Sequence, residues 1–153
     1  MKGMKMLFLG IAILIVLLLI AGFVRGGQSQ TPPELGLIKG HLQACPDKPN
    51  CVCSESEAVD KVHAIAPLAI ADWQALRQAV EGAGGKIVFD GGRYLHATFT
   101  SAVFRFVDDV ELRLDVEQGL VHIRSASRVG HSDFGVNRKR VEAIRARMGV
   151  NRP

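Results

Sequence analysis

The apolar run from Leu7 to Val24 constrains this chain more than any other feature. Fourteen of its 18 residues are Leu, Ile, Val or Phe. As a helix, a run of this length extends about 27 Å, close to the thickness of the hydrocarbon core of a bilayer. Its insertion is favourable by roughly 4 to 8 kcal/mol on a biological insertion scale. The sequence therefore predicts a membrane helix over residues 7–24.

Three interpretations of this run compete: an uncleaved anchor, a cleaved signal peptide and a buried core helix. A signal peptide has a shorter apolar core and small residues before its cleavage site, whereas Phe23 and Arg25 occupy that position here. This favours the anchor. Lys2 and Lys5 precede the run, a modest bias that keeps the N-terminus inside. We expect a single-pass protein of the cytoplasmic (inner) membrane, with its C-terminal domain in the periplasm or another extracytoplasmic space.

The charge of the chain is distributed unevenly. Residues 1–27 hold three basic residues and no acid, so the remainder, with 16 basic and 15 acidic residues, is nearly neutral. This balance gives little support to nucleic-acid binding. Residues 28–117 carry 8 basic and 13 acidic residues, whereas residues 118–153 carry 8 basic and 2 acidic ones. The two parts either complement each other in the fold or leave a basic surface for an anion.

The three cysteines lie close together, between residues 45 and 53. A turn rich in Pro, Asp and Asn separates Cys45 from Cys51, and such a pair tends to oxidise outside the cytosol. We expect a Cys45–Cys51 disulfide, worth roughly 2 kcal/mol on the loop-entropy model, and leave Cys53 free or intermolecular. The spacing fits a zinc site with His41 or His63 less well, and no partner activates Cys53 as a nucleophile. We expect no metal and no cofactor.

Two stretches have the spacing of an amphipathic helix. Asp72 can cap the first, which ends near Gly82. Its buried side holds Trp73, Leu76 and Val80. Ser132 or Asp133 can cap the second, whose buried stripe holds Phe134, Asn137, Val141, Ile144 and Met148. Its first turns are crowded by Arg138, Lys139 and Arg140. The helix dipole disfavours cations there, so acids or an anionic ligand must compensate.

Four strand-like segments with turns between them occupy residues 86–128. The first two, Lys86–Asp90 and Tyr94–Thr100, flank Gly91 and Gly92, a strong hairpin signal. We therefore predict an α+β fold: an N-terminal transmembrane helix, then a two-layer domain with a four-stranded antiparallel sheet and two helices on one face. The expected boundaries are 1–25 for the anchor, 26–60 for an extracytoplasmic tether with the cysteine segment, and 61–150 for the domain.

The apolar alternation sets the expected strand register. Two-residue turns at 101–102 and 118–119 give the pairs Phe99 with Phe104, Ala97 with Phe106, Leu114 with Ile123 and Val116 with Val121. The same register sets Asp115 opposite His122 and Asp109 opposite Arg128, so His122 is expected in an ion pair. Asp108 would point inward, where an unpaired carboxylate is costly. A bend or bulge is therefore expected near residues 107–109.

The densest polar stretch of the chain runs from Arg124 to Arg140. Guanidinium groups, hydroxyls and free N–H groups at a helix start are the components of a carboxylate or phosphate site. The predicted binding residues are Arg124, Ser125, Arg128, Ser132, Asp133, Asn137, Arg138 and Arg140, with Asp109 and Glu111 of the neighbouring strand. The same groups can instead satisfy one another and stabilise the fold. Both interpretations stay open at this point.

Most catalytic templates fail on this sequence. His131, Ser132 and Asp133 are consecutive, so their side chains diverge and form no relay. The enzymatic alternative is a small envelope hydrolase or lyase using Asp109, Glu111 and His122. The main prediction is not enzymatic and names no catalytic residue. It is a binding or accessory module that recognises an anionic small molecule or an envelope protein through an Arg/Asp-rich face.

Three blocks of the sequence together resemble a known family. They are Cys45-Pro-x3-Asn50-Cys51, Phe106-Val-Asp-Asp-Val-Glu111 and Arg124-Ser-Ala-Ser-Arg128-x-Gly130-x-Ser132-Asp133-x-Gly135-x-Asn137-Arg138-x-Arg140. The pattern, over about residues 45–148, resembles the family named domain of unknown function 1499 (DUF1499). The resemblance implies a small bacterial or plastid protein, often membrane-anchored or exported, and it implies no reaction. The chain departs from the family at Cys53, where Ser is usual.

Overall fold

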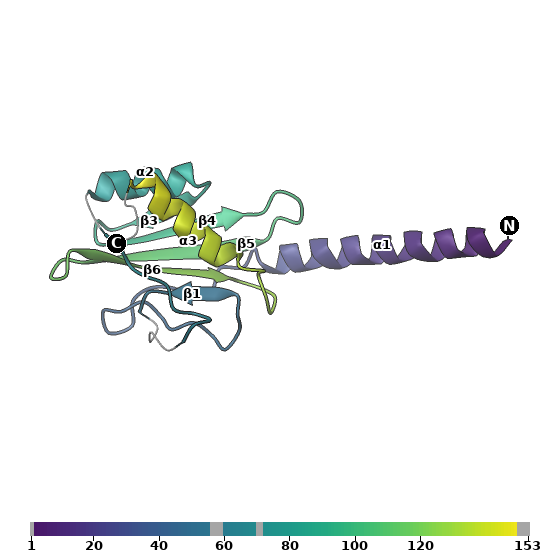
Figure 1. Ribbon diagram of the computed structural model, residues 1–153, viewed down its shortest axis with the longest axis horizontal. Coiled ribbons are helices and arrows are strands. Elements are labelled where there is room, and N and C mark those ends of the chain that lie inside the picture. The colour runs from purple at the N-terminus through teal and green to yellow at the C-terminus, as the bar shows by residue number, and fades with distance from the viewer. Residues whose placement is uncertain (1, 56–59, 70–71, 150–153) are drawn as a thin grey trace.

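The computed structural model describes residues 2–55, 60–69 and 72–149, and shows a long helix leading into a sheet with two further helices (Figure 1). The elements are α1 (Lys2–Gln28), β1 (Cys51–Cys53), β2 (Leu68–Ala69), α2 (Trp73–Gly82), β3 (Lys86–Asp90), β4 (Tyr94–Thr100), β5 (Val107–Asp115), β6 (Leu120–Ser127) and α3 (Val136–Arg147). The α+β prediction is thus confirmed at the level of class.

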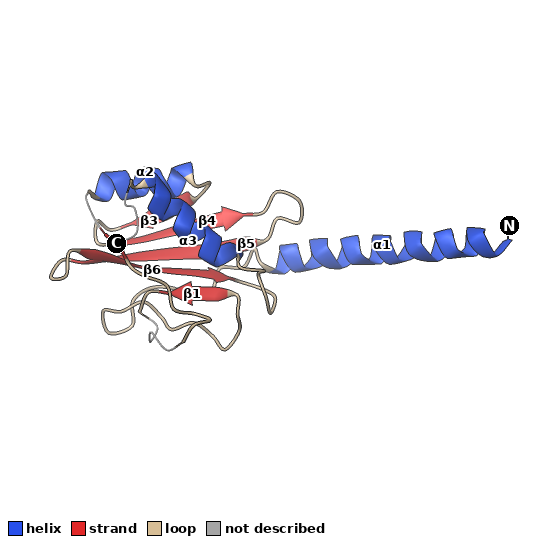
Figure 2. Ribbon diagram, in the orientation of Figure 1, coloured by secondary structure: helices blue, strands red, loops and turns tan. Residues whose placement is uncertain are grey.

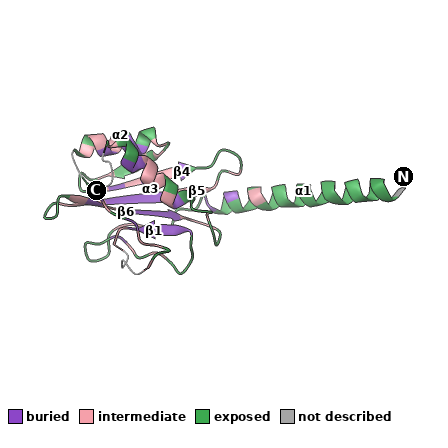
Figure 3. Ribbon diagram, in the orientation of Figure 1, coloured by how far each residue is buried: buried purple, intermediate pink, exposed green. Residues whose placement is uncertain are grey.

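Helix α1 contains the predicted anchor. Among the described residues it is the one helix long and apolar enough to cross a membrane, a property it shares with signal sequences. Its side chains are exposed along nearly the whole length (Figure 3). The exception is the junction with the domain, where Gly26 and Ser29 are buried. The helix therefore offers an apolar surface to its surroundings and contacts the domain only at its C-terminal end.

The sheet has six strands, which corrects the prediction of four. Its order is β1-β6-β5-β4-β3, all neighbours are antiparallel, and β2 also pairs with β6. The two added strands have three and two residues. Segments this short show no alternation of apolar and polar residues, so periodicity could not reveal them. Both lie along β6, with Cys51 opposite Ala126 and Leu68 opposite Val121.

The β3–β4 hairpin is confirmed, but the predicted register of β5 with β6 is wrong. Leu112 pairs with Ile123, and Leu114 pairs with Val121. The reason is a four-residue loop over residues 116–119 in place of the expected two-residue turn, which leaves Val116 exposed. The register is shifted by two residues, an even number, so every side chain keeps its predicted face.

The predicted register of β4 with β5 is also wrong. Phe99 lies opposite Asp108, and Ala97 opposite Val110, because β5 begins only at Val107. The preceding phenylalanines leave the sheet, and the ring of Phe104 packs against Phe23 of α1. No bulge interrupts the pairing of residues 107–109; the irregularity lies instead between Ile87 and Phe89 of β3.

Helices α2 and α3 cover one face of the sheet, as predicted (Figure 2). Asp72 caps α2 by accepting a hydrogen bond from the Ala75 amide (3.0 Å). Trp73 packs against the core and donates from its indole nitrogen to Asp90 (3.0 Å). The buried apolar residues beneath the helices include Leu76, Val80, Leu95, Val110, Leu112, Val121, Ile123, Val141 and Ile144. Strand alternation directs the charged residues of β5 and β6 to the opposite face, with the exception of Asp108, which lies on the helix side and pairs with Arg140 of α3.

Candidate anion-binding site

The predicted binding residues do not form one cluster, because they divide between the two faces of the sheet. Asp109, Glu111 and Arg124 point away from the helices, and Arg128 joins them by its contact with Asp109. On the helix side lie Ser125, Ser132, Asp133, Asn137, Arg138 and Arg140. The alternation of strand β6 separates Arg124 from its neighbour Ser125.

Asp109 lies at the centre of the first polar group. Arg128 donates to both of its carboxylate oxygens (2.7 Å each), which confirms the predicted ion pair although the residue opposite Asp109 is Ala126. His96 donates to the same carboxylate (2.8 Å). Asp109 is only 2% exposed. Burial by itself would raise its pKa, but the hydrogen bonds and charges of Arg128 and His96 outweigh burial and hold the pKa below its ordinary value.

Glu111 forms the second polar group and is fully buried. Arg124 donates to one of its oxygens (3.0 Å), and Tyr94 donates to the other (2.6 Å). The backbone amide of Gly36 donates to that second oxygen as well (3.0 Å). Burial, followed by the hydrogen bond to Glu111, raises the pKa of the Tyr94 phenol well above its ordinary value. Both Asp109 and Glu111 are therefore enclosed with a guanidinium partner.

His122 lies beside acidic groups, as predicted, although the residue directly opposite is Arg113. Its ring nitrogens are each 3.9 Å from a carboxylate, one of Glu55 and one of Asp115. Burial lowers the pKa of His122 and favours the neutral ring. The hydroxyl of Ser54 lies 3.2 Å from Nδ1. Since Asp109 and Glu111 are neutralised by arginines, this arrangement gives the hydrolase or lyase alternative no support.

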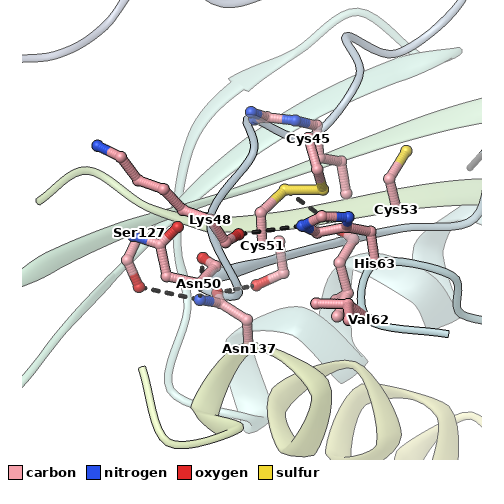
Figure 4. Close-up of a disulfide and its surroundings, with 12 residues drawn as sticks. Cys45, Lys48, Asn50, Cys51, Cys53, Val62, His63, Ser127 and Asn137 are labelled. Atoms are coloured by element: carbon pink, nitrogen blue, oxygen red, sulfur yellow. Dashed lines mark hydrogen bonds between the residues drawn. A yellow bond between two sulfur atoms is a disulfide. The ribbon is translucent and has the colours of Figure 1, made fainter. Parts of the chain in front are cut away.

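Asn137 explains how a polar residue fits the buried stripe of α3. The nitrogen of its side-chain amide, which has two hydrogens, lies within hydrogen-bond distance of Asn50 O (3.0 Å), Ser127 Oγ (2.9 Å) and Asp133 Oδ2 (2.8 Å). The side-chain oxygen of Asn137 accepts from Ser125 Oγ (2.6 Å). Figure 4 shows Asn137 pointing from α3 toward Asn50 and Ser127. The side chain thus joins the cysteine loop, β6 and the start of α3, and all of it is buried.

Two of the three cations at the start of α3, Arg138 and Arg140, are compensated by the protein itself. Arg140 forms an ion pair with Asp108 (2.6 Å) and lies over the ring of Phe99 (4.7 Å to the centroid). This contact also explains how Asp108 points inward without a bulge. Arg138 donates to the carbonyls of Val62 and Ala64 (2.9 Å each). These pairings favour the structural interpretation of the predicted arginines over a role in binding a ligand.

The N-cap of α3 is Gly135, which has no side-chain cap, so neither Ser132 nor Asp133 takes the predicted position. Asp133 nevertheless binds amides at the start of the helix from the preceding loop. Its carboxylate accepts hydrogen bonds from the amides of Gly135 (2.9 Å) and Asn137 (2.7 Å). Burial alone would raise its pKa, but these backbone hydrogen bonds outweigh it and lower the pKa. Ser132 accepts instead from the amide of Phe134 (3.3 Å), outside the helix.

The Cys45–Cys51 disulfide is present, which confirms that prediction (Figure 4). Cys53 lies outside the disulfide and is buried. His63 holds the disulfide loop by donating to Lys48 O (3.0 Å), and its other ring nitrogen donates to Asp60 (2.6 Å). The hydrogen bond to Asp60 is the main reason that the pKa of His63 is raised. Within the described ranges, no three His, Cys, Asp or Glu side chains are grouped as metal ligands.

A pocket of about 380 Å³ lies at the junction of α1 with the domain. We call it the juxtamembrane pocket, and its lining residues are Arg25, Gln28, Lys48, Val129, Gly130 and His131. Three of these carry basic side chains, and none is acidic. In the part of the chain that the structure describes, Arg25, Lys48 and His131 take part in no ion pair. The pocket therefore combines unneutralised positive charge with space for a small ligand.

Sequence reasoning missed this pocket because its basic residues come from three distant segments. Arg25 lies in the last turn of α1, Lys48 belongs to the disulfide loop, and His131 follows β6. The side-chain amide of Asn50 donates to Gly130 O (3.1 Å). This hydrogen bond connects the disulfide loop to the segment after β6. The one available signal was that Asn50 and Gly130 both belong to the blocks that carry the family resemblance.

A larger pocket of about 480 Å³ lies between β4 and α3 and is also partly basic. Lys139 and Arg140 line it together with Phe99 and Asp108. Because Asp108 neutralises Arg140, this pocket has less free positive charge than the juxtamembrane pocket. We therefore take the juxtamembrane pocket as the candidate anion-binding site.

A comparison with protein families supplies the assignment that geometry alone cannot. The family described as "Protein of unknown function (DUF1499)" matches residues 41–148, from the segment before β1 through α3. No curated protein and no solved structure matches the chain. The resemblance noted in the sequence is thus confirmed, and the chain belongs to the DUF1499 family.

Proposed function

We propose that this protein is a membrane-anchored extracytoplasmic module that binds an anionic ligand in the juxtamembrane pocket. In this proposal residues 1–25 anchor the chain, residues 26–60 connect the anchor to the domain, and residues 61–150 supply most of the domain. The observation that carries the proposal is the set of three basic side chains, from three segments, around one pocket without an acid.

The junction between α1 and the domain supports an uncleaved anchor. Ser29 Oγ donates to Gly26 O (2.6 Å) and accepts from the amide of Val107 (3.0 Å). Arg128, which holds Asp109, also donates to Ser29 O (3.1 Å). Cleavage within α1 would remove contacts that the domain makes with the end of the helix, and cleavage beyond Arg25 would remove a wall of the pocket.

The disulfide supports an extracytoplasmic location for the domain. Disulfides persist in oxidising compartments and are rare in the cytosol. The bond between Cys45 and Cys51 closes the loop that carries Lys48, one of the pocket residues. Figure 4 shows the Lys48 side chain extending away from the disulfide. Oxidation thus fixes the segment from which Lys48 reaches the pocket.

The chemistry of the pocket favours a small ligand that carries a phosphate or carboxylate group. Arg25 offers the planar fork of donors that suits either group, and Lys48 adds a point charge. A volume of about 380 Å³ is within the usual range for small-molecule sites. Because Arg25 directly follows the apolar run, the phosphate of a lipid headgroup and a soluble phosphate are both chemically suitable. The test below separates these two sources.

The test uses the full chain in nanodiscs, with binding measured by calorimetry for two probes: inorganic phosphate and short-chain phosphatidylglycerol. Arg25→Gln and Lys48→Gln should each weaken binding by roughly tenfold or more, because a charge-assisted hydrogen bond contributes about 1.5–3 kcal/mol. Lys139→Gln, in the larger pocket, is the matched control and should bind as the unmodified chain does.

Binding of the lipid probe alone would assign the pocket to headgroups, and binding of both probes would assign it to phosphate as such. Binding of neither probe at millimolar concentration would contradict the proposal. So would a loss in Lys139→Gln that equals the loss in Lys48→Gln, because the site would then be the pocket between β4 and α3.

A further inference from the structure

The loop between β4 and β5, residues 101–106, packs directly on the membrane helix. The ring of Phe104 lies 5.3 Å from the ring of Phe23, edge to face. The same ring lies so close to Gly22 that a Cβ there would be 2.6 Å from it. A Cβ on Gly26 would be 1.7 Å from Phe104 O. The two glycines are four residues apart and therefore on one face of the helix, where they form a notch that receives the loop.

These contacts fix the depth of the loop relative to the apolar run. Gly22 and Phe23 belong to that run, which ends at Val24. A ring in contact with Gly22 lies about 3 Å inside that end, given the rise of about 1.5 Å per helical residue. Phe104 is therefore level with the last apolar turn of α1 and not with the polar residues that follow it.

The tip of the loop is apolar and exposed. Val103, next to Phe104, is 64% exposed, although the domain has an apolar core available. Arg105 follows, with a side chain long enough to extend from an apolar layer to a polar one. Phe134, in the loop between β6 and α3, is 89% exposed. Figure 1 shows both loops at the end of the domain from which α1 leaves.

We propose that the β4–β5 loop inserts Val103 and Phe104 into the outer leaflet of the bilayer that α1 crosses. The partner that contacts this loop is lipid, because the apolar surface of the loop is continuous with the apolar surface of α1 through Phe104 and Phe23. Moving the apolar side chains of Phe and Val from water into an apolar layer is favourable. Together with α1, the loop gives the domain a second attachment and holds the juxtamembrane pocket toward the headgroups. This inference rests on the anchoring role of α1 and is independent of any ligand.

The test uses the full chain with Cys53→Ser, which leaves no thiol outside the disulfide for an environment-sensitive fluorescent label. A single label is placed by Val103→Cys, Val116→Cys or Leu14→Cys, and the chain is incorporated into liposomes that contain brominated lipids. Val116 is the matched control, because it is 61% exposed and lies in the β5–β6 loop at the opposite end of the sheet.

The label at position 103 should be quenched several-fold more strongly than the label at 116, with blue-shifted emission. Quenching at 14 without quenching at 103 would overturn the inference and leave the anchor intact. Absence of quenching at 14 would overturn the anchor itself. Equal quenching at 103 and 116 would show that the domain has no fixed orientation, which also contradicts the inference.

A second pair of variants tests the notch. Gly26→Ala places a Cβ against Phe104 O, whereas a Cβ on Gly27 has no atom within 4 Å. In the chain labelled at position 103, Gly26→Ala should reduce quenching markedly, and Gly27→Ala should leave it unchanged. Equal quenching in the two variants would contradict the role of the notch in holding the loop at the membrane.

Discussion

On the helix side of the sheet, Leu112 and Ile123 lie buried beneath α2 and α3. On the other side Asp109 and Glu111, neighbours of Leu112 along the same strand, are just as inaccessible, with exposures of 2% and 0%. One face is closed by apolar packing and the other by paired charges. The difference arises from what covers each face.

Helices satisfy their own backbone hydrogen bonds, so an apolar surface can pack beneath them. The polar face is instead contacted by irregular chain whose backbone groups need partners. Glu111 accepts from the amide of Gly36 (3.0 Å), and Arg128 donates to the carbonyls of Ser29 and Gln30 (3.1 and 3.2 Å). Glu111 and Arg128, which belong to the predicted binding residues, thus hold the segment after α1 on the sheet.

The largest effect should come from Arg128→Ala, which leaves the buried carboxylate of Asp109 without its guanidinium. Loss of one partner of a buried ion pair costs about 4 kcal/mol. Chemical unfolding of the full chain in detergent micelles, followed by the fluorescence of the single tryptophan, Trp73, measures this change. Arg147→Ala is the control, since Arg147 is exposed and donates to Ala143 of its own helix (3.3 Å). If Arg128→Ala reduced the free energy of unfolding no more than Arg147→Ala does, the polar face would be dispensable for folding.

On the apolar face, Leu112→Ala should reduce the free energy of unfolding by about 3 kcal/mol, because it leaves a cavity. Val116→Ala, at an exposed position, should have no such effect. Acidification separates the two faces: protonation of Asp109 should reduce the loss caused by Arg128→Ala, whereas the loss caused by Leu112→Ala should not depend on pH. The same pH response in both variants would contradict the comparison between the faces.

The disulfide should have the next largest effect, at the edge of the sheet where β1 joins it. Replacing both Cys45 and Cys51 by Ser should cost about 2 kcal/mol on the loop-entropy model. Thermal unfolding with and without a reductant measures the change, and the reductant should not affect the double variant further. Cys53→Ser is the control, and its melting temperature should still fall when reductant is added. A double variant as stable as the unmodified chain would show that the loop needs no bridge.

The smallest effects concern two histidines with opposite pKa shifts. Burial lowers the pKa of His122, so its contribution to stability is present above about pH 6.5 and is lost as the pH falls. The hydrogen bond from His63 to Asp60 raises the pKa of His63, so its contribution is present below about pH 6.5 and is lost as the pH rises through the folded pKa.

Melting temperatures between pH 5 and pH 8 test this pair. His122→Asn should reduce the fall in melting temperature as the pH is lowered. His63→Asn should reduce the fall in melting temperature as the pH is raised. If both substitutions change the melting temperature on the same side of the pH range, acidic or alkaline, the assignment of at least one histidine is wrong.

Local patterns in the sequence predicted much of the fold. The Gly91–Gly92 hairpin, the cap at Asp72 and the disulfide depend on residues close together in the chain, and all three are present. The exact register was not predictable, because Asp115 accepts from the Gln118 amide (3.0 Å) and supports a longer turn than the apolar alternation required. An even shift leaves that alternation unchanged.

The candidate site was less predictable than the fold. The stretch from Arg124 to Arg140 suggested one surface, but a strand, a loop and a helix direct its side chains to different places. The Gly36 amide donates to Glu111 although the two residues are 75 positions apart. Neither composition nor periodicity predicts such a contact. The basic residues of the juxtamembrane pocket also lie far apart in the chain. In the sequence, Arg25 serves to argue against a signal-peptide cleavage site and gives no sign of a pocket.

The glycine notch on α1 has a mechanical consequence. Gly22 and Gly26 receive the β4–β5 loop without an intervening side chain. The end of the helix and the sheet therefore rotate as one rigid body. A membrane helix changes its tilt when the thickness of the bilayer changes. If α1 crosses a bilayer, such a tilt swings the whole domain, so the height of the pocket above the lipid surface follows the thickness of the membrane.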